Sequence, residues 1–114
     1  MKDGLLVVIA SNVVGDGEPD LGEKLMGAFL AQLLETGSVP EKMIFMGAGV
    51  FLTTSDDTGL NALLKRFEED GTVIRSCGTC LEYYDRKDRL RVGAPGNMAE
   101  TVEDMVRFEK VIRI

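Results

Sequence analysis

Two short runs of branched apolar residues, 5–10 and 43–46, constrain the fold of this chain more than any other feature. Both runs are apolar throughout, as expected of strands that are buried on both faces of a parallel sheet. Residues 72–76 and 110–114 are also rich in branched side chains, and residues 90–92 form a weaker run of the same kind. The sequence therefore predicts five strands.

Apolar residues at helical spacing occupy the segments between these strands. In the first segment they recur every four positions, at Leu21, Leu25, Phe29 and Leu33, and Leu30 and Leu34 widen this apolar face. In the second they lie at Leu60, Leu63, Leu64 and Phe67. A short helix is predicted after Cys77, and Asn97 is predicted to cap a fourth helix, with Glu100 completing a capping box. The expected buried face of that fourth helix consists of Met98, Val102, Met105 and Val106.

Five strands that alternate with four helices predict an α/β fold, a three-layer α/β/α sandwich with a five-stranded parallel sheet. At 114 residues the chain fits one domain, which we assign to residues 1–114. The loops that follow the carboxyl ends of parallel strands share one edge of the sheet, and ligands bind along that edge. The residues expected to line a pocket there are Ser11, Asn12, Gly47, Gly49, Thr53, Asn97 and Met98.

Both cysteines of the chain lie in one C-x-x-C segment, Cys77-Gly78-Thr79-Cys80, where the third strand ends and a helix begins. A thiol at a helix N-terminus is favoured as thiolate, and here the backbone N–H groups of Gly78 and Thr79 would stabilise it. We expect Cys77 to be the more exposed sulfur and the nucleophile, and Cys80 to be its resolving partner. The alternative is that two small thiols merely pack at the end of a strand.

Composition excludes several classes of function. The formal charge of −6 argues against nucleic acid as a partner, and no run of residues approaches the length of a membrane span. The chain has no histidine, so we expect no metal and no cofactor, and a cysteine nucleophile must be activated without a Cys-His pair. Reduced cysteines and the lack of a signal pattern predict a cytoplasmic protein.

The basic residues of the segment 86–91 are either a solvated face, a docking site for an acidic partner, or an aid to thiol ionisation.

With these motifs in view, the sequence resembles the DsrE family, and in particular the carboxyl-terminal domain of YedF-like proteins, which are described as sulfurtransferase-like selenium-metabolism proteins. The resemblance covers nearly the whole chain, and its segments are 15–22, 46–50, 76–84, 97–98 and 110–114. It implies a three-layer α/β/α fold, homo-oligomers such as trimers, and sulfur handling through a cysteine persulfide.

The resemblance also assigns roles. The persulfide cysteine of the sulfur-relay members ends the third strand, a position that falls on Cys77, whereas Cys80 belongs to the C-x-x-C pattern of YedF-like proteins. That pattern leaves open whether Cys80 resolves the persulfide, carries it or forms a disulfide. Full-length YedF-like proteins carry a SirA/TusA-like domain that this sequence lacks. The resemblance therefore implies either a separate SirA/TusA-like protein as the sulfur donor or a chain that is part of a longer protein.

The leading hypothesis is a cytoplasmic sulfur carrier or sulfurtransferase-like protein that accepts sulfane sulfur as a cysteine persulfide and passes it to an acceptor thiol. Two alternatives stay open. One is a non-catalytic binding or assembly module for a sulfur or selenium metabolite or a protein partner. The other is a dithiol–disulfide oxidoreductase that cycles between the reduced and disulfide forms of the C-x-x-C pair.

Overall fold

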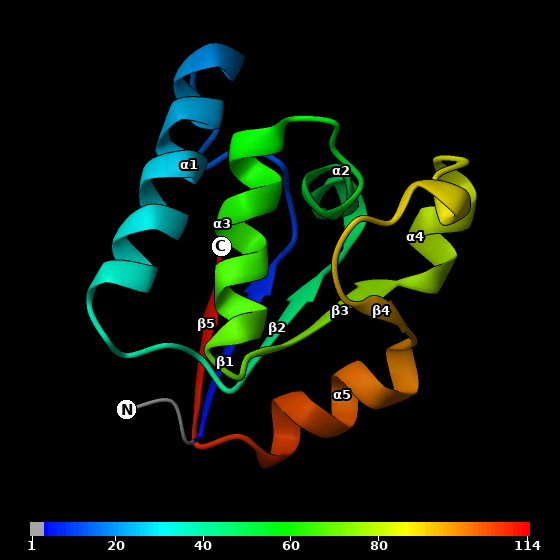
Figure 1. The fold of residues 1–114 in the computed structure, drawn as a ribbon. Coiled ribbons are helices and arrows are strands. Elements are labelled where there is room, and N and C mark those ends of the chain that lie inside the picture. Colours follow the sequence, from blue (N-terminus) through cyan, green and yellow to red (C-terminus); the bar gives the residue numbers. More distant parts are fainter. Residues whose placement is uncertain (1–3) are drawn as a thin grey trace.

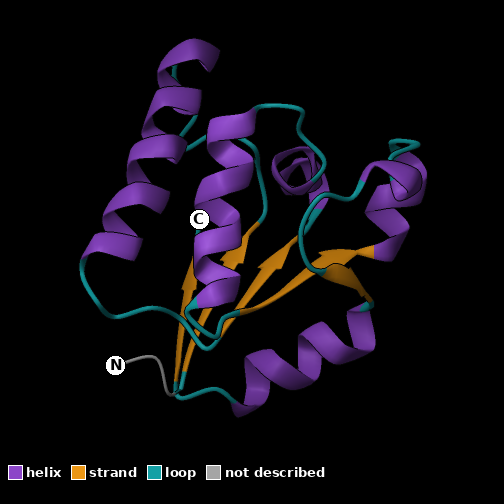
Figure 2. Cartoon of the chain, in the orientation of Figure 1, coloured by secondary structure: helices purple, strands orange, loops and turns teal. Residues whose placement is uncertain are grey.

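The five strands form one sheet with the order β4-β3-β2-β1-β5, in which all neighbouring strands are parallel. The structure is a computed structural model that describes residues 4–114 (Figures 1 and 2). The strands are β1 (Leu5–Ile9), β2 (Lys42–Phe45), β3 (Val73–Cys77), β4 (Ala94–Gly96) and β5 (Lys110–Arg113). The helices are α1 (Pro19–Glu35), α2 (Val50–Thr53), α3 (Thr58–Glu69), α4 (Gly78–Tyr83) and α5 (Met98–Arg107), with 3-10 turns η1 (Gly47–Gly49) and η2 (Lys87–Arg89). The predicted α/β fold with a five-stranded parallel sheet is confirmed.

The strand order explains which helices share a face of the sheet. The connections from β1 to β4 all step in one direction, whereas the connection from β4 to β5 crosses back over the sheet. Because such crossovers are right-handed, a reversal of direction moves the connecting helix to the opposite face. Helices α1 and α3 accordingly pack together on one face (Figure 1), and α5 covers the other.

The main core lies between the sheet and the pair α1 and α3. It is formed by alternate residues of β1 and by one face of each helix, including Val7, Ile9, Leu30, Leu64 and Phe67, each fully buried. A smaller cluster on the opposite face consists of Leu6, Val8 and Ile44, with Met46 and Phe108 against it. The sheet is therefore covered thickly on one face and thinly on the other.

One predicted helix face is correct in part and another is wrong. On α1 the predicted Leu30 and Leu34 are buried together with Met26, and Phe29 and Leu33 pack against the core, whereas Leu21 and Leu25 are half exposed. On α5 the predicted core residues Met98, Val102, Met105 and Val106 are exposed, with Val106 at 82%. Thr101 and Asp104 face the sheet instead.

The orientation of α5 has an electrostatic cause. Lys42 Nζ lies 2.5 Å from Asp104 Oδ2 and 2.6 Å from Glu100 Oε2, so a lysine of the sheet fixes the polar side of α5 against it. Asn97 caps the helix as predicted, because its Oδ1 accepts a hydrogen bond from the Glu100 amide at 2.8 Å. The Glu100 carboxylate does not complete the capping box, since it pairs with Lys42 and Arg75.

The fourth strand is displaced from its predicted place. Residues 90–92 form a loop in which Val92 fills the main core and the Arg91 amide donates to the Thr53 carbonyl. The strand itself is β4, Ala94–Gly96, at the edge of the sheet. An edge strand needs little apolar content and tolerates Pro95, which lacks an N–H, so the apolar pattern did not reveal it.

A close approach at Gly49 yields a stability prediction. A Cβ atom at this position would lie 2.3 Å from the Ile9 carbonyl oxygen. We expect Gly49→Ala to lower the free energy of unfolding by at least about 2 kcal/mol, since backbone must move to admit the methyl group. The matched control is Gly27→Ala on α1, where a Cβ meets no atom within 4 Å, and which should gain about 0.5–1 kcal/mol. Urea unfolding measures both, and equal effects would contradict the close approach.

Candidate functional site

The cysteine pair lies at the carboxyl edge of the sheet, as predicted. Cys77 ends β3 and is the N-cap residue of α4, and Cys80 lies in the first turn of that helix. Gly96, the last residue of β4, is the register partner of Cys77. The loop after β2 reaches the pair from the other side, because the Gly47 amide donates a hydrogen bond to Cys80 Sγ at 3.2 Å. Loops from three strands therefore meet at the two thiols.

The exposure of the two cysteines is the reverse of the expectation. Cys77 is only 8% exposed, whereas Cys80 is partly exposed, and both are free thiols. Cys77 is still a strand residue held in register with Gly96, so it stays within the sheet. Cys80, one turn further along, lies on the helix and nearer to solvent. A reactant approaching this edge meets Cys80 first.

The protonation of Cys80 is set by its surroundings. Burial, followed by a hydrogen bond to Cys77, raises the pKa of the Cys80 thiol above its ordinary value of 9.0, and the Gly47 N–H only partly opposes this. Cys80 is therefore protonated near neutral pH, and its S–H donates toward Cys77. No capping hydrogen bond from the first turn of α4 reaches the Cys77 side chain, so stabilisation by Gly78 and Thr79 stays a prediction.

The raised pKa of Cys80 predicts the pH dependence of its alkylation. In the wild-type chain, the rate of Cys80 modification by iodoacetamide should rise with a midpoint above pH 9.0. In Cys77→Ala the midpoint should fall, because the hydrogen bond to Cys77 and the charge of Cys77 are removed while burial remains. Peptide mapping at a series of pH values measures both rates. A wild-type midpoint well below 9.0 would contradict this description of the site.

Gly47 is the residue that brings the second loop to the thiols. Its φ of +54° lies in the left-handed region, and a Cβ there would lie 3.0 Å from the Ala10 carbonyl oxygen. Glycine adopts this conformation without steric cost. The backbone of η1 therefore turns tightly against the end of β1 and aims the Gly47 N–H at Cys80.

The other predicted pocket residues are divided among different roles. Ser11 Oγ accepts a hydrogen bond from the Val13 amide in a local turn. Thr53 is fully buried, and its hydroxyl lies 2.7 Å from the Ser76 hydroxyl. Asn97 caps α5, and Met98 beside it is 57% exposed. Of the predicted set, Asn12 alone lines the cavity between α1, α2 and α3.

That cavity has a volume of about 540 Å³ and is separate from the cysteine pair. It is bordered by α1, α2, the following loop and α3, and neither cysteine lines it. Sequence reasoning missed its main lining residues, among them Glu23, Phe51 and Asp57. Apolar and acidic residues of this kind indicate a pocket only when it is known that α1 and α3 are neighbours in the fold.

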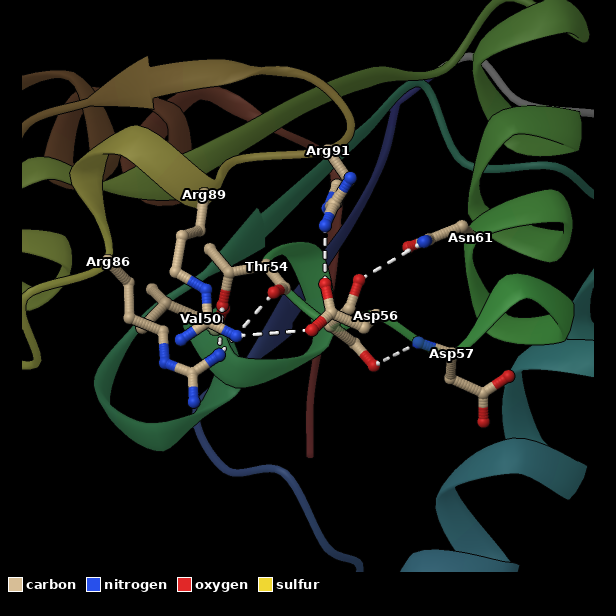
Figure 3. A network of polar contacts seen from close by, with 9 residues as sticks. Val50, Thr54, Asp56, Asp57, Asn61, Arg86, Arg89 and Arg91 are labelled. Carbon is tan, nitrogen blue, oxygen red and sulfur yellow. Dashed lines mark hydrogen bonds and ion pairs between the residues drawn. The ribbon is translucent and has the colours of Figure 1, made fainter.

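The basic segment is largely engaged within the chain. Arg86 donates to the Thr54 carbonyl and hydroxyl, and its guanidinium lies 4.6 Å from the centre of the Phe51 ring. Arg89 and Arg91 both pair with Asp56 (Figure 3), and the Arg91 contact is the shorter one. These pairs hold the pKa of Asp56 below its usual range, through the hydrogen bond from Arg91 first. The arginines of this segment therefore hold the loop between α2 and α3 in place.

No three histidine, cysteine or carboxylate side chains within residues 4–114 gather closely enough to hold a metal ion. None of the helices in that range is long and apolar enough to cross a membrane.

The sheet order and the helix arrangement define a mixed α/β protein with a DsrE-like fold. The crystal structure of the ychN protein from E. coli is similar to this chain with a TM-score of 0.74, at 15% sequence identity and over 100% of both chains. BT1422 from Bacteroides thetaiotaomicron, a conserved protein of unknown function, has a TM-score of 0.67 at 17% identity, over 97% of this chain and 95% of its own.

At these identities the similarity establishes the fold alone. The resemblance to DsrE proteins is thereby confirmed at the level of fold. No protein-family model matches the chain, and no curated protein matches it in sequence.

Proposed function

We propose that this chain is a sulfur carrier, or sulfurtransferase-like protein, that holds sulfane sulfur as a persulfide on Cys77. The observation that carries the proposal is the contact between two free thiols at the carboxyl edge of the sheet, where burial and Cys77 raise the pKa of the Cys80 thiol. Cys80 is kept protonated by burial and by Cys77, which leaves Cys77 as the attacking sulfur of the pair. The DsrE-like fold is consistent with this role.

The loading step is a thiol exchange that needs no cofactor. The Cys77 thiolate attacks the outer sulfur of a donor persulfide, the sulfur–sulfur bond of the donor breaks, and the donor leaves as a thiolate. The transferred sulfur keeps its oxidation state and its proton, so the products are a persulfide on Cys77 and the thiolate of the donor. A thiolate of the acceptor then attacks that outer sulfur and regenerates Cys77.

Cys80 provides a second outcome for the loaded state. If the Cys80 sulfur attacks the inner sulfur of the Cys77 persulfide, a Cys77–Cys80 disulfide forms and hydrogen sulfide leaves. The two cysteine thiols are oxidised in this step and the sulfane sulfur is reduced. The raised pKa of Cys80 slows the attack at neutral pH, which favours delivery of the sulfur to an external acceptor.

Protein donors and acceptors fit the surroundings of the thiols. Tyr83, one turn after Cys80 on α4, is 82% exposed, and Thr79 is also exposed. Exposed aromatic side chains are favourable contact points for partner proteins. We propose a separate SirA/TusA-like protein as the donor, a cytoplasmic setting in which the thiols stay reduced, and a relationship to YedF-like domains and selenium metabolism.

The contact between the two thiols also favours a second candidate, a dithiol–disulfide oxidoreductase. One experiment separates the two functions. The reduced chain is incubated with glutathione persulfide that carries isotopically labelled sulfur, and then with an acceptor thiol. A carrier moves the label to the acceptor repeatedly, and Cys80→Ser still does so. An oxidoreductase yields an unlabelled acceptor disulfide, and Cys80→Ser abolishes its turnover.

Self-association is supported by the exposed apolar side of α5. Met98, Val102, Met105 and Val106 lie on one flank of the helix, and all four are uncharged. A chain with a net charge of −6 repels its copies elsewhere, so an uncharged apolar flank is the favoured contact between them. We therefore propose a homo-oligomer, with a trimer expected from the family resemblance.

We expect Val106→Glu to weaken this association by about tenfold or more, because a buried unpaired charge would face the neighbouring copy. The control is Glu103→Gln, which lies on the same helix outside that flank and should leave the association unchanged. Analytical ultracentrifugation measures both variants. A wild-type chain that stays monomeric at high micromolar concentration would contradict the proposal.

A further inference from the structure

The cavity of about 540 Å³ has a floor and a mouth of different chemistry. Its apolar lining includes Met26, Leu52, Leu60 and Leu63. Its polar lining consists of Asn12, Ser55, Glu23 and Asp57, and of these Glu23 of α1 and Asp57 before α3 are exposed and mark the mouth. The volume falls within the range of small-molecule sites, roughly 300–1,000 Å³. A ligand of matching chemistry has an apolar body and a polar head.

The two carboxylates at the mouth of the cavity determine which charge the polar head of the ligand carries. Of the residues described by the structure, those lining the cavity include no lysine and no arginine. Glu23 forms no ion pair in residues 4–114. A carboxylate, phosphate or sulfur oxyanion would face two carboxylates there, and Arg86, whose guanidinium stacks on the lining residue Phe51, is already hydrogen-bonded to Thr54. A protonated amine would meet both of them favourably.

The Asp57 carboxylate is positioned for such a contact. Its Oδ1 atom accepts the Gly59 and Leu60 amides at 2.9 and 3.1 Å as the cap of α3, which fixes the side chain. Figure 3 shows this carboxylate turned away from Arg89 and Arg91, on the side toward α1. Both of those arginines bind Asp56 instead, so the adjacent aspartates have separate roles.

The loop between α2 and α3 is held in place before any ligand binds. Arg86 fastens Thr54, and the arginines at 89 and 91 fasten Asp56 (Figure 3). On the α3 side, Asn61 Nδ2 donates to the Ser55 carbonyl at 3.1 Å. A wall fixed in this way loses little conformational freedom on binding, which favours affinity.

We propose that this cavity binds a small organic amine, with its ammonium group between Glu23 and Asp57 and its apolar body on Phe51, Leu60 and Leu63. This site goes beyond the sulfur-carrier function, because neither cysteine lines the cavity. The apolar floor distinguishes the ligand from a hydrated metal ion, which needs oxygen ligands all around it. Binding is therefore independent of the state of the thiols.

The test compares three probes of the same shape and different charge. Phenethylamine, phenethyl alcohol and phenylacetate are titrated into the full chain by calorimetry, with saturation-transfer NMR as a second readout. We expect the amine to bind about tenfold or more tightly than the alcohol, and phenylacetate to give no signal. Comparable affinities for the amine and phenylacetate, or no binding of the amine at millimolar concentration, would overturn the proposal.

Variants test the location of the site. Gly27 lines the cavity in open space, so Gly27→Phe should fill it and abolish amine binding, whereas Ala28→Phe on the exposed side of α1 should leave binding unchanged. Glu23→Gln and Asp57→Asn should each weaken the amine about tenfold, and asparagine keeps the cap of α3. Cys77→Ser should bind the amine as the wild type does. Unchanged affinity in Gly27→Phe would refute the assignment.

Discussion

Replacing Cys77 by serine is expected to lower the rate of labelled-sulfur transfer by about 10³-fold or more, to the background of the donor alone. The serine hydroxyl cannot be ionised at neutral pH and forms no persulfide. The fold should persist, because no capping hydrogen bond of Cys77 is lost and serine is a favourable N-cap residue. The measurement is transfer from glutathione persulfide to an acceptor thiol, with thermal unfolding as the check on the fold.

Cys80→Ser is the matched control for this variant. It has the same change of atom three residues further along the chain, in the first turn of α4, yet we expect it to keep sulfur transfer and to lengthen the lifetime of the loaded state. The reason is that the Cys80 sulfur can no longer displace sulfide from Cys77. Transfer retained in Cys77→Ser and lost in Cys80→Ser would move the sulfur-accepting role to Cys80.

Replacing Lys42 by methionine is expected to lower the free energy of unfolding by about 3 kcal/mol. The Lys42 side chain is 11% exposed and that of Asp104 only 4%, so the substitution leaves a buried carboxylate without its close cation. Arg107 remains 3.6 Å from Asp104 but is largely exposed. The control Lys65→Met, on the exposed side of α3, should change stability by less than about 0.5 kcal/mol. If urea unfolding shows the same loss of unfolding free energy in Lys42→Met and Lys65→Met, the role of the Lys42 contacts is contradicted.

The double variant Lys42→Met/Asp104→Leu should recover most of the loss of stability, because it removes both charges from the buried contact.

The contact between Lys42 and Asp104 in the wild type also predicts that stability depends on pH in the alkaline range. Burial opposes the charge of Lys42, but contacts with Asp104 and Glu100 outweigh it and raise the pKa above 10.5. The stabilisation of the folded state by the Lys42 ammonium is complete below pH 10.5. It is lost as the pH rises through the folded-state pKa of Lys42. Stability should therefore fall more steeply above this pH in the wild type than in Lys42→Met.

The strands could be predicted from the sequence where burial alone determines their residues. Central strands β1 and β2 are covered on both faces, so they appear as unbroken apolar runs. The edge strand β4 has no such constraint, and its residues Ala94–Gly96 carry no periodic signal. Apolar spacing located α5 but assigned the wrong face, because a lysine of β2 determines which side of the helix turns inward.

The thiol site was predictable because its residues are adjacent in sequence. The C-x-x-C segment identified both cysteines, and the α/β alternation placed them at the correct edge of the sheet. The Gly47 contact could not be found in this way, since it joins residues 33 positions apart. The cavity was hidden for the same reason, because its lining comes from segments that meet only when α1 packs against α3.

The central claim, that Cys77 accepts sulfane sulfur, is tested most directly by intact-protein mass spectrometry of the reduced chain after treatment with a persulfide donor. Peptide mapping then locates the added sulfur. We predict one added sulfur atom, removable by a reductant, on Cys77 in the wild type and in Cys80→Ser, and none in Cys77→Ser. Sulfur located on Cys80, or no added sulfur while both thiols of the folded chain resist alkylation, would contradict the claim.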